Sequence, residues 1–135
     1  MGTWAVDAFG NDYAQDWAQD LHETSNLDAV EDTLNTALDA AGELDAPFAA
    51  EALVAIEVLA RLQGKGGPST QDSAPVDEWV AARKPKAKHR ADLADKAVRA
   101  LERILSADSE LRQLWEESEH YKDWLAAVED LRSRL

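Results

Sequence analysis

The stretch from Phe48 to Gln63 constrains the fold of this chain most strongly. It reads FAAEALVAIEVLARLQ, and Glu51, Glu57 and Arg61 are its only charged residues. A helix that is apolar over most of its circumference belongs in the interior of a protein. The stretch therefore predicts a central helix, around which the rest of the chain packs. Its predicted apolar positions are Phe48, Ala52, Leu53, Val54, Ile56, Val58, Leu59, Ala60 and Leu62.

Two helices are predicted before the central one. The first begins near Asp12, with Asn11 or Asp12 as its cap, because both residue types accept hydrogen bonds from free backbone N–H groups. Its apolar side is formed by Tyr13, Ala14, Trp17, Ala18 and Leu21. The second follows a break at Ser25-Asn26, carries an apolar stripe from Leu27 to Ala41 and stops at Gly42, where a C-terminal glycine is expected.

After the central helix, glycines, a proline and small polar residues indicate a flexible linker at about 63–75. A short helix over Val76–Arg83 leads into a basic loop at about 83–90, which Pro85 keeps from being helical. The remaining apolar patterns predict three helices: one from His89 or Arg90 to about Ala107, one capped by Asp108, and one from near His120. We predict an all-α fold, with residues 1–135 as one domain: a bundle of about six to seven helices with a short irregular N-terminal lead-in.

The charge of the chain is strongly asymmetric. Residues 1–60 contain 13 acids and no lysine or arginine, whereas residues 61–135 contain 14 acids and 14 bases, so the net charge of −13 belongs entirely to the N-terminal part. Nucleic acid is not expected as a partner, because phosphate contacts need lysine and arginine. A basic protein is the partner that this charge favours. The alternative is that the acids only keep the protein in solution and complement the basic stretch near residues 83–103.

Composition excludes several classes of chemistry. The chain has no cysteine, so disulfides, thiol catalysis and thiolate metal sites are ruled out. The three histidines are scattered, and we expect neither a metal site nor a cofactor. No apolar run approaches the length of about 20 residues that crosses a bilayer, and no signal peptide is visible. We expect a soluble cytoplasmic protein that does not bind membranes, with its oligomeric state left open.

The densest cluster of aromatic and acidic side chains lies at the N-terminus. Its candidate binding residues are Trp4, Phe9, Asn11, Asp12, Asp16 and Trp17. A carboxylate beside apolar rings can have a raised pKa and act as an acid or base. The competing interpretation is structural: the rings fill the core, Asn11 or Asp12 caps the helix, and the acids face water.

With these residues in view, the chain resembles a family of small bacterial proteins catalogued as domain of unknown function 4259. That family typically opens with the pattern W-G-x-G-x-F-x-N-D-x-A-x-D-W, and Trp4, Phe9, Asn11-Asp12 and Asp16-Trp17 follow it here. The segment Ser109–Glu117 and the segment Trp124–Leu131 resemble its C-terminal part. The chain departs from the pattern at Ala5 and Asp7, where the family usually has glycines. The resemblance implies a bacterial origin and a single helical domain, and it brings no established activity or catalytic residues.

Two functional hypotheses follow from the sequence. The first is a non-catalytic interaction module whose acidic N-terminal half meets a basic partner, in an inhibitory or immunity-like role. The second is an enzyme or small-ligand-binding protein with a site around the N-terminal cluster. The first is favoured, because neither a nucleophile–base pair nor a metal cluster can be found, and no catalytic residue is assigned.

Overall fold

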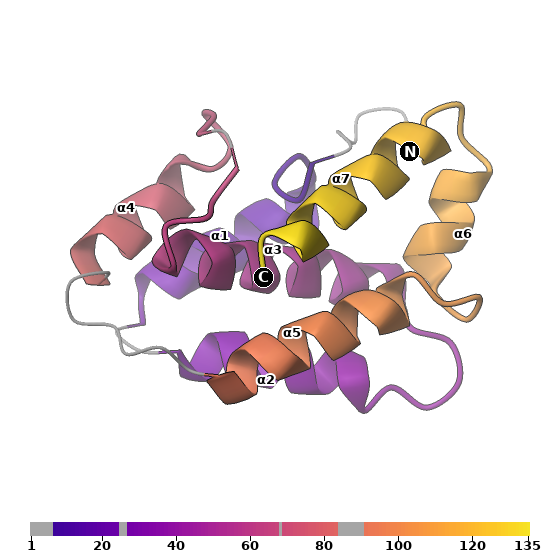
Figure 1. Ribbon diagram of the computed structural model, residues 1–135, viewed down its shortest axis with the longest axis horizontal. Coiled ribbons are helices and arrows are strands. Elements are labelled where there is room, and N and C mark those ends of the chain that lie inside the picture. The colour runs from indigo at the N-terminus through magenta and orange to yellow at the C-terminus, as the bar shows by residue number, and fades with distance from the viewer. Residues whose placement is uncertain (1–6, 25–26, 68, 84–90) are drawn as a thin grey trace.

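The computed structural model describes residues 7–24, 27–67, 69–83 and 91–135 (Figure 1). Within these ranges the chain forms a single bundle of seven helices, which confirms the predicted all-α class, and residues 7–11 form an irregular lead-in. The helices are α1 (Asp12–His22), α2 (Asp28–Leu38), α3 (Ala46–Leu62), α4 (Ala74–Arg83), α5 (Ala91–Ile104), α6 (Glu110–Glu116) and α7 (Tyr121–Ser133). The predicted break at Ser25-Asn26 and nearly all of the basic loop, residues 84–90, lie outside the described residues.

Helix α3 is the centre of the bundle, as its sequence predicts. It packs against each of the other six helices, and 13 of its 17 residues are buried. In Figure 1, α2 and α5 lie below α3 and α7 lies above it, while α4 and α6 stand at opposite ends. Ile56, in the middle of α3, has no exposed surface. The hydrophobic core is therefore organised around this one helix.

Two helices end earlier than their apolar patterns suggest. Helix α2 stops at Leu38 and not near Ala41, and Gly42 then takes a positive φ of 76° in the loop that turns toward α3. Helix α5 stops at Ile104 and not near Ala107, because Ser106 donates both its backbone N–H and its hydroxyl to the carbonyl of Arg103 and closes a turn. In both cases apolar residues continue past the last helical turn, so the pattern overestimates the helix length.

The predicted cap of α6 is also corrected by the structure. Ser109, and not Asp108, is the N-cap, and its hydroxyl accepts a hydrogen bond from the backbone N–H of Arg112. The cause is a bridge between distant loops: Leu44 N–H donates to the carbonyl of Asp108 at 2.7 Å, and Glu110 N–H donates to the carbonyl of Leu44 at 2.9 Å. The bridge buries Leu44 and Ser109 completely and ties the loop before α3 to the start of α6.

Helix α4 begins at Ala74, two residues before its predicted start. The residues before it form a reciprocal pair, in which Thr70 N–H donates to the Ser73 hydroxyl at 2.8 Å and Ser73 N–H donates to the Thr70 hydroxyl at 3.2 Å. The hydroxyl of Ser73 also lies 2.8 Å from the Asp77 carboxylate. The helix therefore takes over the last two residues of the predicted linker.

Two aromatic residues that the sequence places on apolar stripes are exposed. Tyr13 is 42% exposed and Phe48 is 43% exposed. Both belong to the first turn of a helix, and each ring lies on the uncovered side of a turn in which Ala14 or Ala46 is buried. The prediction that Phe48 belongs to the core is therefore wrong, and the ring is available at the surface.

Candidate functional site

The structure separates the residues of the predicted N-terminal cluster. Phe9 and Trp17 are buried, and Trp17 donates from its indole Nε1 to the hydroxyl of Thr33 on α2 at 2.8 Å. Asp12 and Asp16 are exposed on α1. Trp4 lies outside the described residues. The described members of the cluster thus lie in different places, and Phe9 alone among them lines the partly open cavity described below.

Asn11 is the cap of α1. Its side-chain oxygen accepts a hydrogen bond from the backbone N–H of Ala14 at 2.9 Å, and its own backbone is extended, as an N-cap requires. Asp12 is the next residue and stands in the first turn, where its negative charge faces the positive end of the helix dipole. Of the two residues that the sequence offers as caps, the structure selects Asn11.

A groove runs between α2, the loop after it and the first turns of α3. We call it the acidic groove. It is lined by Asp32, Asn35, Thr36, Asp39, Ala40, Ala41, Glu43, Asp45 and Phe48, and a smaller hollow beside it adds Thr33 and Glu51. The groove is open and has a volume of about 650 Å³. No lysine or arginine is among its described lining residues, and the exposed ring of Phe48 lies among the carboxylates.

Four acids of the groove take no part in the ion pairs of the described residues. In the described part of the chain, no ion pair involves Asp32, Asp39, Glu43 or Asp45. Arg103 of α5 contacts the loop that lines the groove through the backbone, because its guanidinium donates to the carbonyl of Gly42 and to that of Asp108. It therefore holds the loop in shape and leaves the carboxylates of the groove to the solvent.

Glu51 lies at the buried edge of this region. Its pKa is raised above the ordinary value of 4.5, chiefly because burial disfavours the charged form, and secondarily because the negative charge of Asp20 on α1 lies near it. The raised pKa means that the charged form of Glu51 is less favourable in the folded protein than in water. Negative charge is thus concentrated here at some cost to folding.

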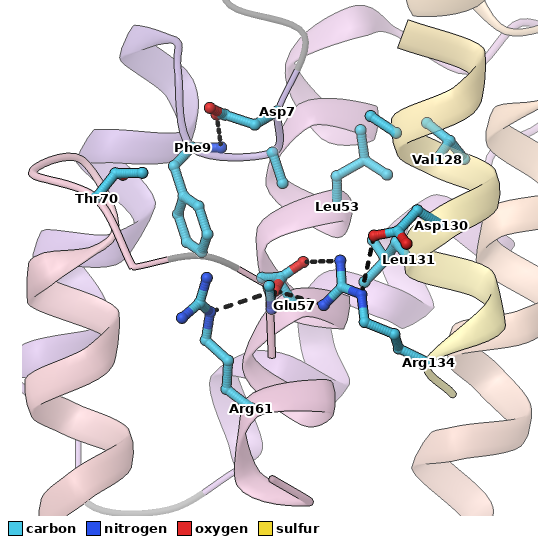
Figure 2. A pocket seen from close by; sticks show the side chains of 13 residues that line it. Asp7, Phe9, Leu53, Glu57, Arg61, Thr70, Val128, Asp130, Leu131 and Arg134 are labelled. Atoms are coloured by element: carbon cyan, nitrogen blue, oxygen red, sulfur yellow. Dashed lines mark hydrogen bonds and ion pairs between the residues drawn. The ribbon is translucent and has the colours of Figure 1, made fainter. Parts of the chain in front are cut away.

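A second hollow lies on the other side of α3, between the lead-in, the loop before α4 and α7 (Figure 2). We call it the Glu57 cavity. Its volume is about 230 Å³. Phe9, Leu53, Val128 and Leu131 provide buried apolar walls. The remaining lining residues are Asp7, Ala8, Glu57, Arg61, Gly67, Thr70, Ala127, Asp130 and Arg134.

A buried ion network forms one wall of this cavity. Glu57 is only 4% exposed, and its carboxylate accepts from Arg134 twice, Nη1 to Oε1 at 2.9 Å and Nη2 to Oε2 at 3.1 Å (Figure 2). Its Oε1 also accepts from the backbone N–H of Gly67 at 3.1 Å and lies 3.3 Å from Arg61 Nε. The hydrogen bonds that Arg134 donates to Glu57 raise the pKa of the Arg134 guanidinium.

Arg61 links the network to two further elements. Its Nη1 donates to Asp77 of α4 at 2.6 Å, and its guanidinium carbon lies 5.1 Å from the centre of the Phe9 ring. A cation over an aromatic face is held by the quadrupole of the ring. The lead-in, α3, α4 and α7 are therefore joined through one charged cluster.

Sequence reasoning did not identify the Glu57 network. Glu57 and Arg61 stand one turn apart in an otherwise apolar helix, and charged residues at i and i+4 in such a helix are a signal of a buried ion pair. Arg134 lies 77 residues from Glu57 and carries no such signal. Only the packing of α7 on α3 brings it there.

The part of the chain that the structure covers lacks the residues for two kinds of site. No group of three or more His, Asp or Glu side chains is placed to hold a metal ion. None of the described helices has the length and hydropathy that a membrane-spanning segment needs.

Comparison with known proteins yields one match. A family model described as a domain of unknown function (DUF4259) matches residues 2–127. Neither the curated proteins nor the solved structures contain a match to this chain.

Proposed function

Because the chain belongs to the DUF4259 family, a family of unknown function, we propose a function from its surface: an interaction module that binds a basic protein through the acidic groove. The observation that carries this proposal is the exposed ring of Phe48 among carboxylates that form no ion pair within the described part of the chain. An aromatic ring in a concave, charged surface is the type of residue that anchors protein interfaces.

The charge of the groove specifies the partner. Asp32, Asp39, Glu43 and Asp45 together attract a surface rich in lysine and arginine, and such attraction raises the rate of association. Phe48 requires that the same surface also carry an apolar side chain. We therefore expect the partner to present a basic segment with an apolar residue at its centre. The bound module would cover the cationic side chains of this segment and block their function. This is the inhibitory or immunity-like role that the charge asymmetry suggests.

An enzyme around the N-terminal cluster is the weaker alternative. Asn11 is used as a cap, Trp17 is bonded to Thr33, and Asp16 stands in solvent. A general base must reach its substrate in a site that excludes water. The described residues of the cluster form no such site, whereas the acidic groove is open and charged.

The proposal can be tested with a basic amphipathic peptide of lysine and leucine, labelled for fluorescence anisotropy. In one variant, D39K and E43K reverse two charges of the groove, and in a matched control E119K and E129K reverse two exposed charges that do not line it. Both proteins have the same net charge, so non-specific attraction is equal. We expect the groove variant to lose at least about tenfold in affinity, equivalent to about 1.4 kcal/mol, and the control to lose much less.

F48A provides a second readout that is independent of charge. The substitution should weaken binding of the peptide without changing the salt dependence of its affinity, because the lost contact is apolar. Equal losses in the groove variant and in its matched control would contradict the proposal, since binding would then follow net charge alone.

A further inference from the structure

We propose that the Glu57 cavity binds a small neutral organic molecule with an aromatic or aliphatic body and a hydroxyl group. The cavity shares no lining residue with the acidic groove. The inference therefore does not depend on the proposed function, and either one can fail alone.

The size of the cavity and the apolar residues of its walls determine the size and polarity of the main part of the ligand. Its volume is about 230 Å³, and an apolar cavity of about 150 Å³ already accepts benzene. Phe9, Leu53, Val128 and Leu131 are each at most 6% exposed and present carbon atoms from three separate elements. A single substituted ring would cover these walls, and release of water from them would drive binding.

The charges around the cavity argue for a neutral ligand. Arg61 and Arg134 are matched by Glu57, by Asp77 behind Arg61 and by Asp130 on α7, while Asp7 stands at the rim. A cation would meet the two guanidinium groups, and an anion would meet the carboxylates. Either would lose its hydration without gaining an unpaired partner, which is costly in a partly enclosed site.

The Glu57 carboxylate is the reason to expect a hydroxyl group on the ligand. Its Oε1 has three donors close to it, from Gly67, Arg61 and Arg134. Its Oε2 accepts, within the described residues, only from Arg134 Nη2. A carboxylate oxygen can accept two hydrogen bonds, so Oε2 has capacity for one more donor. A ligand O–H next to the apolar walls would supply it, and a hydrogen bond to a buried carboxylate is a strong one.

The test uses three probes of one shape in a two-dimensional ¹H–¹⁵N NMR titration of the full chain: p-cresol, toluene and p-toluate. We expect p-cresol to shift the amides of Phe9, Leu53, Val128 and Leu131 saturably. Toluene lacks the hydroxyl and p-toluate carries a negative charge, so each should bind at least about tenfold more weakly.

Two tryptophan substitutions on adjacent residues of α7 make the matched pair. Ala127 lines the cavity and is half-buried, whereas Ala126 is exposed and does not line it. A127W should abolish the p-cresol shifts, and A126W should leave them at the wild-type affinity. The probe comparison in the wild-type protein needs neither variant to fold.

Several results would overturn the inference. One is the absence of saturable shifts at millimolar p-cresol. Others are equal affinities for p-cresol and toluene, shifts centred on Phe48 and the acidic groove, and equal effects of A126W and A127W. Each would show that the walls or the carboxylate of the cavity do not recognise the probe.

Discussion

The guanidinium of Arg134 donates two hydrogen bonds, of 2.9 and 3.1 Å, to the carboxylate of Glu57. The two residues lie 77 positions apart, one near the end of α7 and one in the middle of α3. Arg134 also donates to the carbonyl of Lys65 and to the carboxylate of Asp130. The contact thus attaches the last helix and the loop after α3 to the central helix, and it closes one wall of the Glu57 cavity.

Breaking this contact should destabilise the fold measurably. Arg134→Gln leaves the Glu57 carboxylate, which is 4% exposed, with fewer charged donors, and we expect a loss of about 2 kcal/mol in the free energy of unfolding. Arg132→Gln is the control, because its ion pair with Glu102 is largely exposed and should contribute less than about 1 kcal/mol. Urea denaturation measures both. Similar losses for the two variants would mean that the Glu57 contact behaves as a surface ion pair.

The position of α3 in the core predicts that substitutions at two of its residues destabilise the protein to very different degrees. Ile56→Ala should cost about 2–5 kcal/mol, because the side chain has no exposed surface and its removal leaves a cavity. Phe48→Ala should cost less than about 1 kcal/mol, since its ring is 43% exposed. Thermal or urea unfolding distinguishes the two. An Ile56→Ala protein that melts like the wild type would refute the central role of α3.

The cap of α1 can be checked by a pair of adjacent substitutions. Asn11→Ala removes the acceptor of the Ala14 N–H and should cost about 1 kcal/mol. Asp12→Ala removes only a favourable charge in the first turn and should cost about 0.3–1 kcal/mol, at the lower end in high salt. The measurement is urea unfolding at low and high ionic strength. A larger loss for Asp12→Ala at high salt would reverse the assignment.

The raised pKa of Glu51 predicts a pH dependence of stability. The folded state binds this proton more tightly than the unfolded state, so stability due to Glu51 is greatest when the group is protonated and falls as the pH rises above the ordinary value of 4.5 toward the raised pKa. Glu51→Gln removes this loss. The variant should unfold at higher urea concentration than the wild type at pH 7, and the difference should shrink as the pH falls below 4.5.

Glu129→Gln is the control for this experiment, because Glu129 is exposed on α7. It should leave the difference between pH 7 and acid unchanged. A wild-type-like Glu51→Gln protein at both pH values would show that neither burial nor Asp20 affects the carboxyl.

The helical class and the central helix could be predicted because they depend on local information. The 3.6-residue spacing around Trp17, Ile56 or Leu131 needs only neighbouring residues to be recognised, and the near-absence of polar residues in α3 already implies burial on all sides. Caps and helix ends depend on more than local spacing. Ser109 became the cap of α6 through the bridge to Leu44, a residue 65 positions earlier in the chain, and no local pattern contains that bridge.

The candidate sites depended on contacts between distant segments. Sequence alone determined that the chain is helical, that α3 is its centre and that the first 60 residues carry the whole net charge of −13, since these follow from residue types and their spacing. Tertiary structure alone decided that Phe48 stands uncovered among acids and that Arg134 reaches Glu57. The spacing of apolar residues shows which face of a helix is apolar. Which neighbouring helix covers each turn, however, depends on how all the helices pack together in the interior.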